Sequence, residues 1–118
     1  KEQDPSVEIV GVDAEKSNIS SAFYGDDPVE YSTQIEGLGK SGETPTMWFD
    51  YIDRVESVDD RTAIMQARTA ASEHGVLIGT SSSAALKVAR DIAATDPESS
   101  VVLVACDGGE QYFDVLSR

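Results

Sequence analysis

The hydrophobic and polar positions divide the chain into a weakly patterned first half and a strongly patterned second half. Residues 7–12 form a β-rich apolar run closed by Asp13, which predicts a strand. Residues 13–46 are rich in Gly, Ser, Asp and Pro without a sustained period, which predicts an irregular surface region. Residues 46–52 predict one or two helical turns, and residues 54–58 alternate in the way that a short strand does.

The second half contains two segments with helical periodicity. The first begins after Asp59, a residue type that caps helix N-termini, and stops at His74 and Gly75. The second is expected over residues 83–94 and is ended by Asp96-Pro97. Their apolar faces consist of Ala63, Ile64, Ala67, Ala70 and Ala71, and of Ala85, Leu86, Ala89, Ile92 and Ala93.

Apolar runs without a helical period flank the second helix. Residues 76–78 form a brief run, and residues 101–105 are continuously apolar, which predicts a strand covered on both faces. Residues 107–109 predict a turn, and residues 112–116 a terminal helix. Because strands and helices alternate, we expect an α/β fold, a three-layer sandwich with a mainly parallel sheet. Three or four strands make a thin sheet, so the chain is expected to form part of a larger domain.

Composition and charge narrow the possible partners. The 118 residues form one domain at most, and 40% hydrophobic with 26% charged residues is typical of globular proteins. The net charge of −13 argues against nucleic acid or an anionic membrane as the main partner, because both reward clustered Lys and Arg. No apolar run approaches the ~18 residues of a membrane span, and the polar N-terminus does not resemble a signal peptide.

The dispersed acidic residues favour a solvated acidic surface. Adaptation to high salt is an alternative, and equal thermal stability in low and molar salt would exclude it. The single cysteine, Cys106, and the single histidine, His74, argue against a zinc site and exclude an internal disulfide. They favour a reducing, cytoplasmic setting.

Three turns are candidate ligand sites. Gly79–Ser83 precedes a helix, where free N–H groups and small residues admit a ligand, although a simple helix cap explains the same residues. Glu36–Gly39 places two glycines around an apolar residue, and a flexible loop is the alternative. Asp107 follows an apolar run at the edge where open α/β sheets bind ligands, and a turn-forming aspartate is the alternative.

The order of these motifs resembles the C-terminal part of the cystathionine β-synthase and cysteine synthase family, pyridoxal-phosphate (PLP) enzymes of the tryptophan-synthase-β fold type. The matching residues are Val10-Gly11-Val12-Asp13, Glu36-Gly37-Leu38-Gly39, Pro45, Val58-Asp59-Asp60, the run Glu73 to Ala85, and Asp107-Gly108-Gly109-Glu110-Gln111-Tyr112. The resemblance implies that Ser81 hydrogen-bonds the pyridine nitrogen of PLP. It also implies that the cofactor site includes Gly37, Gly39, Gly79 and Asp107, with no metal.

The chain departs from the family's pattern in several places. Ser83 replaces the last glycine of the G-x-S-x-G turn, and Cys106 replaces a common proline. The loop after Gly39 is slightly longer and lacks an aromatic residue. The family's Schiff-base lysine, substrate-carboxylate loop and phosphate loop belong to earlier parts of such enzymes. No lysine here matches the catalytic position, so this chain alone is expected to be inactive; the lysines are Lys1, Lys16, Lys40 and Lys87.

Residues 1–118 are therefore expected to be a single segment, the C-terminal part of a PLP-dependent enzyme of sulfur amino-acid metabolism. The expected reaction is β-replacement on serine or O-activated serine, of the cysteine synthase or cystathionine β-synthase type. The expected partners are an amino-acid substrate, the N-terminal remainder of the enzyme and a second copy in a cytoplasmic homodimer. A non-catalytic α/β binding or interaction module derived from this family is the alternative.

Overall fold

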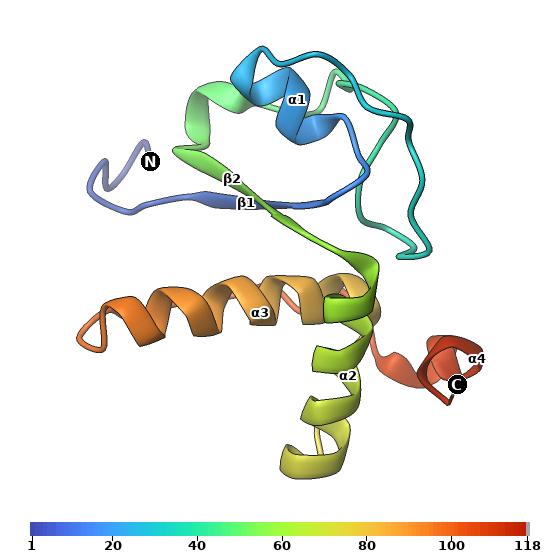
Figure 1. Cartoon of the computed structure of the whole chain (residues 1–118). Helices are drawn as coiled ribbons and strands as arrows, with labels where there is room; N and C mark the ends of the chain where they lie inside the picture. The colour runs from blue at the N-terminus through green and yellow to red at the C-terminus, as the bar shows by residue number, and fades with distance from the viewer. Residues whose placement is uncertain (118) are drawn as a thin grey trace.

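A parallel sheet lies between helices in the computed structural model, which describes residues 1–117 (Figure 1). The sheet has two strands, β1 (Val10–Ala14) and β2 (Arg54–Val58). α1 (Ile19–Tyr24) lies on one side of it, and α3 (Thr80–Thr95) crosses the other side. The α/β class with a parallel sheet, expected from the alternating pattern, is confirmed.

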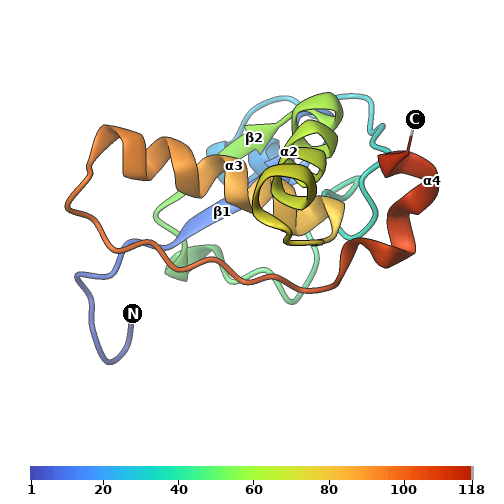
Figure 2. The same ribbon diagram turned by 90° about the horizontal axis from the view of Figure 1, so that it is seen from below.

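The remaining elements surround this sandwich. α2 (Asp60–His74) packs against α3 and projects away from the sheet, and η1 (Phe49–Tyr51) precedes β2. η2 (Gly109–Tyr112) and α4 (Phe113–Leu116) close the chain beside α2. Figure 2 shows that the segment between α3 and η2 returns along the molecule as an extended ribbon. α2 and the terminal helix follow the sequence pattern closely, η1 lies inside the predicted range 46–52, and α3 begins three residues before its predicted start.

The hydrophobic core lies where the sheet meets α2 and α3. Its buried members are Ile35, Val58, Ala63, Ala84 and Val88. Alanines form the buried face of α2, at positions 63, 67 and 70, so α3 packs against a surface without large side chains.

α2 has the ends that its sequence predicts. The Asp59 carboxylate accepts a hydrogen bond from the Thr62 N–H at 2.9 Å, and the Asp60 charge lies in the first turn. At the other end Gly75 has a φ of 67°, and its N–H donates to the Ala71 carbonyl at 3.2 Å. Only glycine adopts this left-handed conformation without a steric penalty, so the stop signal has a conformational cause.

Replacing Asp59 with alanine is expected to lower the free energy of unfolding by about 1 kcal/mol, because the first turn loses its cap. Hydrogen bonds from Thr62 lower the pKa of the Asp59 carboxyl below its ordinary value of 3.8. Its stabilising contribution is therefore complete above that value and is lost as the pH falls through the lowered pKa. Urea unfolding at neutral and acidic pH measures both effects. Asp59→Asn retains an N-cap and should remove the share of the pH dependence that Asp59 contributes; identical urea midpoints for wild type and Asp59→Ala would contradict the prediction.

Two expectations for the first half are wrong in detail. β1 begins at Val10 rather than at residue 7, and α1 lies inside the region 13–46 that was expected to be irregular. α1 has only six residues, and one of its N–H groups donates to a side chain outside the helix. The fully buried Asp13 carboxylate accepts from the Ser20 N–H at 2.9 Å. A helix this short, capped from the end of a strand, has no periodicity to detect.

The second half differs at residues 101–105, which form no strand within the described chain. Val102 is 92% exposed and Val104 is 74% exposed, so the expected burial on both faces is wrong. The expected thin sheet of three or four strands correspondingly has two. The brief run at 76–78 contributes an isolated bridge between Ile78 and Gly108. The apolar pattern is that of a buried strand, but neither β1 nor β2 pairs with this segment in the described residues.

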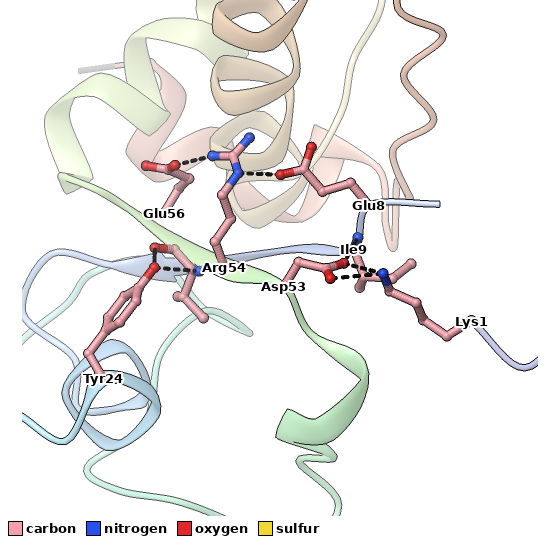
Figure 3. Close-up of polar contacts among 8 residues, drawn as sticks. Lys1, Glu8, Ile9, Tyr24, Asp53, Arg54 and Glu56 are labelled. Atoms are coloured by element: carbon pink, nitrogen blue, oxygen red, sulfur yellow. Dashed lines mark hydrogen bonds and ion pairs between the residues drawn. The ribbon is translucent and has the colours of Figure 1, made fainter. Parts of the chain in front are cut away.

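Side chains fasten β2 to its surroundings (Figure 3). The Tyr24 hydroxyl from α1 donates to the Val55 carbonyl at 3.1 Å and accepts from the Val55 N–H at 3.0 Å. Arg54 forms ion pairs with Glu8 and Glu56. The ion pairs are partly exposed and contribute little to stability, whereas the Tyr24 contacts fix the position of α1 against the strand.

Candidate functional site

The first turn of α3 carries four consecutive hydroxyl residues, Thr80 to Ser83. The helix begins at Thr80 rather than at residue 83, because the predicted turn forms the first helical turn with Gly79 as N-cap. The Ser82 Oγ accepts the Cys106 N–H at 3.1 Å, and the Ser83 Oγ donates to the Gly79 carbonyl at 2.8 Å. Thr80, Ser82 and Ser83 are buried, but Ser81 is half-buried. Ser81 is thus the hydroxyl of this turn that is open to a ligand.

Gly37 lies opposite Ser81. A Cβ placed on Gly37 would lie 3.9 Å from the Ser81 Oγ, and the φ of Gly37 is 80°. The Asp60 carboxylate holds the preceding residues in place, accepting the Thr33 hydroxyl and the Gln34 N–H, both at 2.6 Å. The loop 36–39 and the start of α3, two separate candidates in the sequence, are therefore brought together.

Gly39 has a different surrounding from Gly37. It is buried with a φ of 80°, and a Cβ there would lie 2.9 Å from the Ser17 Cβ. The Ser17 Oγ accepts the Lys40 N–H at 2.9 Å, and the Asn18 amide donates to the Ser41 carbonyl at 3.0 Å. Gly39 thus fixes the loop against the start of α1, and its role in lining a ligand site stays a prediction.

Sequence reasoning missed Ser17, Asn18 and Asp60 as supports of this loop. Their contacts join residues that are more than ten positions apart in the chain. The available signal was their chemistry, because Ser, Asn and Asp are the types that bond backbone groups at helix starts.

Asp107 packs directly against Gly79. The Gly79 N–H donates to the Asp107 carbonyl at 3.1 Å, and a Cβ on Gly79 would lie 1.9 Å from the Asp107 Oδ1. The other carboxylate oxygen accepts a hydrogen bond from the Tyr112 hydroxyl. α4 is tied to α2 by Arg68, which donates to the Leu116 carbonyl at 2.9 Å. The C-terminal segment thereby places Asp107 and Tyr112 at the start of α3.

The phenol of Tyr112 is strongly perturbed. Its hydrogen bond to Asp107 raises the pKa of Tyr112 to about 12, with further contributions from burial and from the negative charges of Asp107 and Glu36. The contribution from Glu36 places the loop before Gly37 within electrostatic range of this tyrosine. Tyr112 belongs to the matched motif, but nothing in the sequence assigns it a role.

We expect the ultraviolet absorbance of tyrosinate to show one late titration in the folded protein, near pH 12. Because this folded-state pKa exceeds the ordinary value of 10.0, the stabilising contribution is complete below pH 10 and is lost as the pH rises toward 12. Tyr112→Phe should remove the late component, whereas Tyr31→Phe, at an exposed position, should retain it. A wild-type titration without a late component would contradict this assignment.

Two buried oxygen atoms at the start of α3 have no hydrogen-bond partner within the described residues: Thr80 Oγ1 and Asp107 Oδ1. Buried polar atoms are rarely left without a partner, which distinguishes these two atoms from the other polar groups of the turn. Both atoms lie near the first turn of α3, where the N–H groups of the helix start have no intrahelical partner. Residues 1–117 contain no cluster of metal-ligating side chains.

Other surface features lie apart from this site. A surface hollow of about 640 Å³ is lined by residues such as Arg54, Asp59, Lys87 and Asp91, in the C-terminal half of α3 and along β2. It includes none of the predicted site residues. Within residues 1–117 no helix has the length and apolar character that crossing a membrane requires.

Comparisons with known proteins extend the motif evidence. A family model described as "Pyridoxal-phosphate dependent enzyme" matches residues 1–107. A cysteine synthase of Helicobacter pylori is 33% identical over 114 residues, covering 96% of this chain and 35% of the relative. An N-(2-amino-2-carboxyethyl)-L-glutamate synthase of Cupriavidus metallidurans is 28% identical over 116 residues, covering 95% of this chain and 32% of the relative.

Solved structures have the same fold. The O-acetylserine-dependent cystathionine β-synthase of Helicobacter pylori superposes with a TM-score of 0.78 at 31% identity, covering 97% of this chain and 36% of that one. The O-acetylserine sulfhydrylase isoform 3 of Entamoeba histolytica gives a TM-score of 0.87 at 22% identity, covering 100% and 35%, and supports the fold alone.

This chain spans about a third of the length of these relatives. The predicted likeness to the C-terminal part of cysteine synthase and cystathionine β-synthase enzymes is confirmed by the names and the partial coverage of the matches. The family match, which covers nearly all of the sequence, shows that the chain belongs to the pyridoxal-phosphate-dependent enzyme family.

Proposed function

We propose that this chain is the C-terminal part of a PLP-dependent enzyme that performs β-replacement on serine or O-activated serine. Ser81 carries the proposal, because its hydroxyl is the one in the α3 turn left open, and it faces the Gly37 loop. Relatives named as cysteine synthase and O-acetylserine-dependent cystathionine β-synthase support this reaction class.

The residues present fit one end of the cofactor. Ser81 would meet the ring nitrogen, and Gly37 keeps a side chain away from the Ser81 hydroxyl, while Gly79 leaves room for Asp107 at the start of the helix. The buried Thr80 oxygen, which has no partner among residues 1–117, supports a further polar contact at this end. Bound PLP supplies an electron sink for negative charge at the substrate Cα, which permits loss of the group on Cβ.

A serine at position 81 is suited to binding the ring nitrogen of the cofactor. A serine hydroxyl is neutral, so it can orient the ring through a hydrogen bond without adding a negative charge that holds a proton on the nitrogen. The backbone around Gly37 and Gly39 is held by Asp60, Ser17 and Asn18, so the loop opposite Ser81 is preorganised. Preorganised contacts of this kind keep the reacting group in position without reorganisation.

The rest of the catalytic machinery is proposed to lie in the N-terminal remainder of the enzyme. No lysine of this chain was matched to the Schiff-base position, so residues 1–118 alone are proposed to be inactive. A cytoplasmic homodimer is proposed for the whole enzyme, on the basis of the family resemblance.

The test uses the full-length protein that contains this chain. Its visible absorption reports bound PLP, and product analysis with serine or O-acetylserine, plus sulfide or a thiol, reports β-replacement. We expect a bound cofactor and a new carbon–sulfur bond with at least one of the two donors. Absence of PLP binding would overturn the proposal. PLP binding without β-replacement would exclude the reaction, and absence of both would favour a non-catalytic interaction module.

A further inference from the structure

The segment from Cys106 to Tyr112 holds the first turn of α3 from one side. The Cys106 N–H binds the Ser82 Oγ at 3.1 Å, and the Asp107 carbonyl accepts the Gly79 N–H at 3.1 Å. The Gly109 N–H donates to the Leu77 carbonyl at 3.3 Å. These contacts fix the backbone on both sides of Ser81 without using the Asp107 side chain.

The Asp107 side chain is therefore held in place for another reason. Tyr112 orients it through one carboxylate oxygen, while the other, Oδ1, is buried against Gly79 and has no partner among residues 1–117. The Thr80 Oγ1, on the next residue, is likewise buried without a partner. A carboxylate with a solely structural role would be expected to have both oxygen atoms satisfied.

The position of Asp107 gives its charge a direct effect on this turn. The start of a helix carries a partial positive charge, which a nearby carboxylate offsets. Negative charge also raises the basicity of a nearby nitrogen atom, and burial strengthens the effect. Three other titratable groups belong to these elements: Tyr112 from η2, which binds Asp107, exposed Glu36, whose charge acts on Tyr112, and exposed Glu110, whose carboxylate lies against Gly108.

We propose that Asp107, oriented by Tyr112, is a positioning residue whose negative charge sets the basicity of the cofactor ring nitrogen held by Ser81. This inference rests on the proposed function. Ser81 supplies the direct, uncharged contact, and Asp107 acts from behind Gly79 at longer range. The two residues together set how readily the ring nitrogen takes up a proton.

The first test is Asp107→Asn in the full-length holoprotein. Asparagine retains an acceptor for the Tyr112 hydroxyl and removes the charge. A pH titration of the cofactor absorption band should have its midpoint lowered by about half a pH unit or more. Asp114→Asn, which removes the charge of an exposed acid in α4, is the matched control and should titrate as wild type does.

Tyr112→Phe is the second variant and keeps the charge while removing its anchor. We expect a several-fold weaker PLP affinity, with a titration midpoint equal to or above that of wild type. This variant keeps the proposal testable if Asp107→Asn does not fold, because a lowered midpoint here would also contradict it. Thermal melting of both variants separates a loss of stability from a change at the cofactor.

The outcomes are distinguishable from those of the proposed function. A wild-type protein that binds PLP and turns over, with an Asp107→Asn variant that titrates identically, would overturn the role of Asp107 alone. An Asp107→Asn variant that melts earlier but keeps the wild-type midpoint would make the residue structural. A wild-type protein without PLP would overturn both proposals.

Discussion

Ser81→Asp in the full-length protein is expected to lower the rate of β-replacement on the order of 10²-fold, the scale for loss of one preorganised polar contact. The hydroxyl is half-buried at the start of α3, where an added carboxylate would meet the ring nitrogen and the nearby Asp107 charge. Aspartate would hold a proton on that nitrogen, which changes the electron demand on the substrate. Steady-state rates with serine and O-acetylserine, together with the cofactor absorption band, measure the effect.

Two variants control for trivial causes. Ser81→Ala removes the hydroxyl without adding a charge. It should shift the cofactor absorption band and cause only a modest loss of cofactor affinity. Ser100→Asp adds the same charge at an exposed loop position and should leave turnover unchanged. Wild-type turnover by Ser81→Asp would remove Ser81 from the proposed site.

Gly79→Ala is expected to destabilise the fold by about 1–3 kcal/mol, the usual cost of overpacking. The added Cβ would lie 1.9 Å from the Asp107 Oδ1 and 3.1 Å from the Tyr112 Cε2. The φ of Gly79 is −66°, so backbone strain makes no contribution and the effect is purely steric. The displaced carboxylate would also lose its Tyr112 hydrogen bond. Urea unfolding measures the loss of stability, and tyrosine titration reports the broken contact.

The control for this variant is Gly42→Ala, because a Cβ on Gly42 would meet nothing within 4 Å. It should unfold at the wild-type urea concentration. A Gly79→Ala/Asp107→Ala double variant should cost less than the sum of the single variants, because removing the carboxylate frees the space. Additive losses would show that the clash with Asp107 is not the cause.

The sequence predicts the long helices well because their signals are local. The cap at Asp59 and the left-handed Gly75 bound α2 where the pattern ends, and α3 differs only at its first turn. β2 also matches its expected range. By contrast, α1 depends on Asp13, a buried residue that caps from the end of a strand.

Residues 101–105 show the limit of an apolar pattern. Five consecutive apolar residues predict burial, but a strand also needs a neighbour that supplies backbone partners. Within residues 1–117 no strand pairs with this segment, and the nearest backbone bridge joins Ile78 to Gly108, beyond its end. The apolar pattern shows that the segment is suited to burial, but burial also requires adjacent strands or helices to cover it.

The candidate site is only partly accessible to sequence reasoning. Motif order brings Gly37, Ser81 and Asp107 into one hypothesis, and the structure places Gly37 against Ser81 and Asp107 against Gly79. The order of the motifs does not predict that Tyr112 binds Asp107 or that Asp60 binds the backbone of the loop, because both contacts depend on which side chains meet in space. Gly39 contacts Ser17 instead of the open hydroxyl.

The Tyr24 hydroxyl has a consequence for how the sheet can grow. It occupies both the N–H and the carbonyl of Val55, the groups that an incoming strand at the outer edge of β2 would need (Figure 3). Such a strand would have to displace a bidentate partner that belongs to the same chain. Unprotected strand edges pair with other polypeptides and lead to aggregation. Tyr24 therefore prevents strand pairing at Val55 on the outer edge of β2. The outer edge of β2 is therefore closed to backbone pairing at Val55 by a side chain of the neighbouring helix.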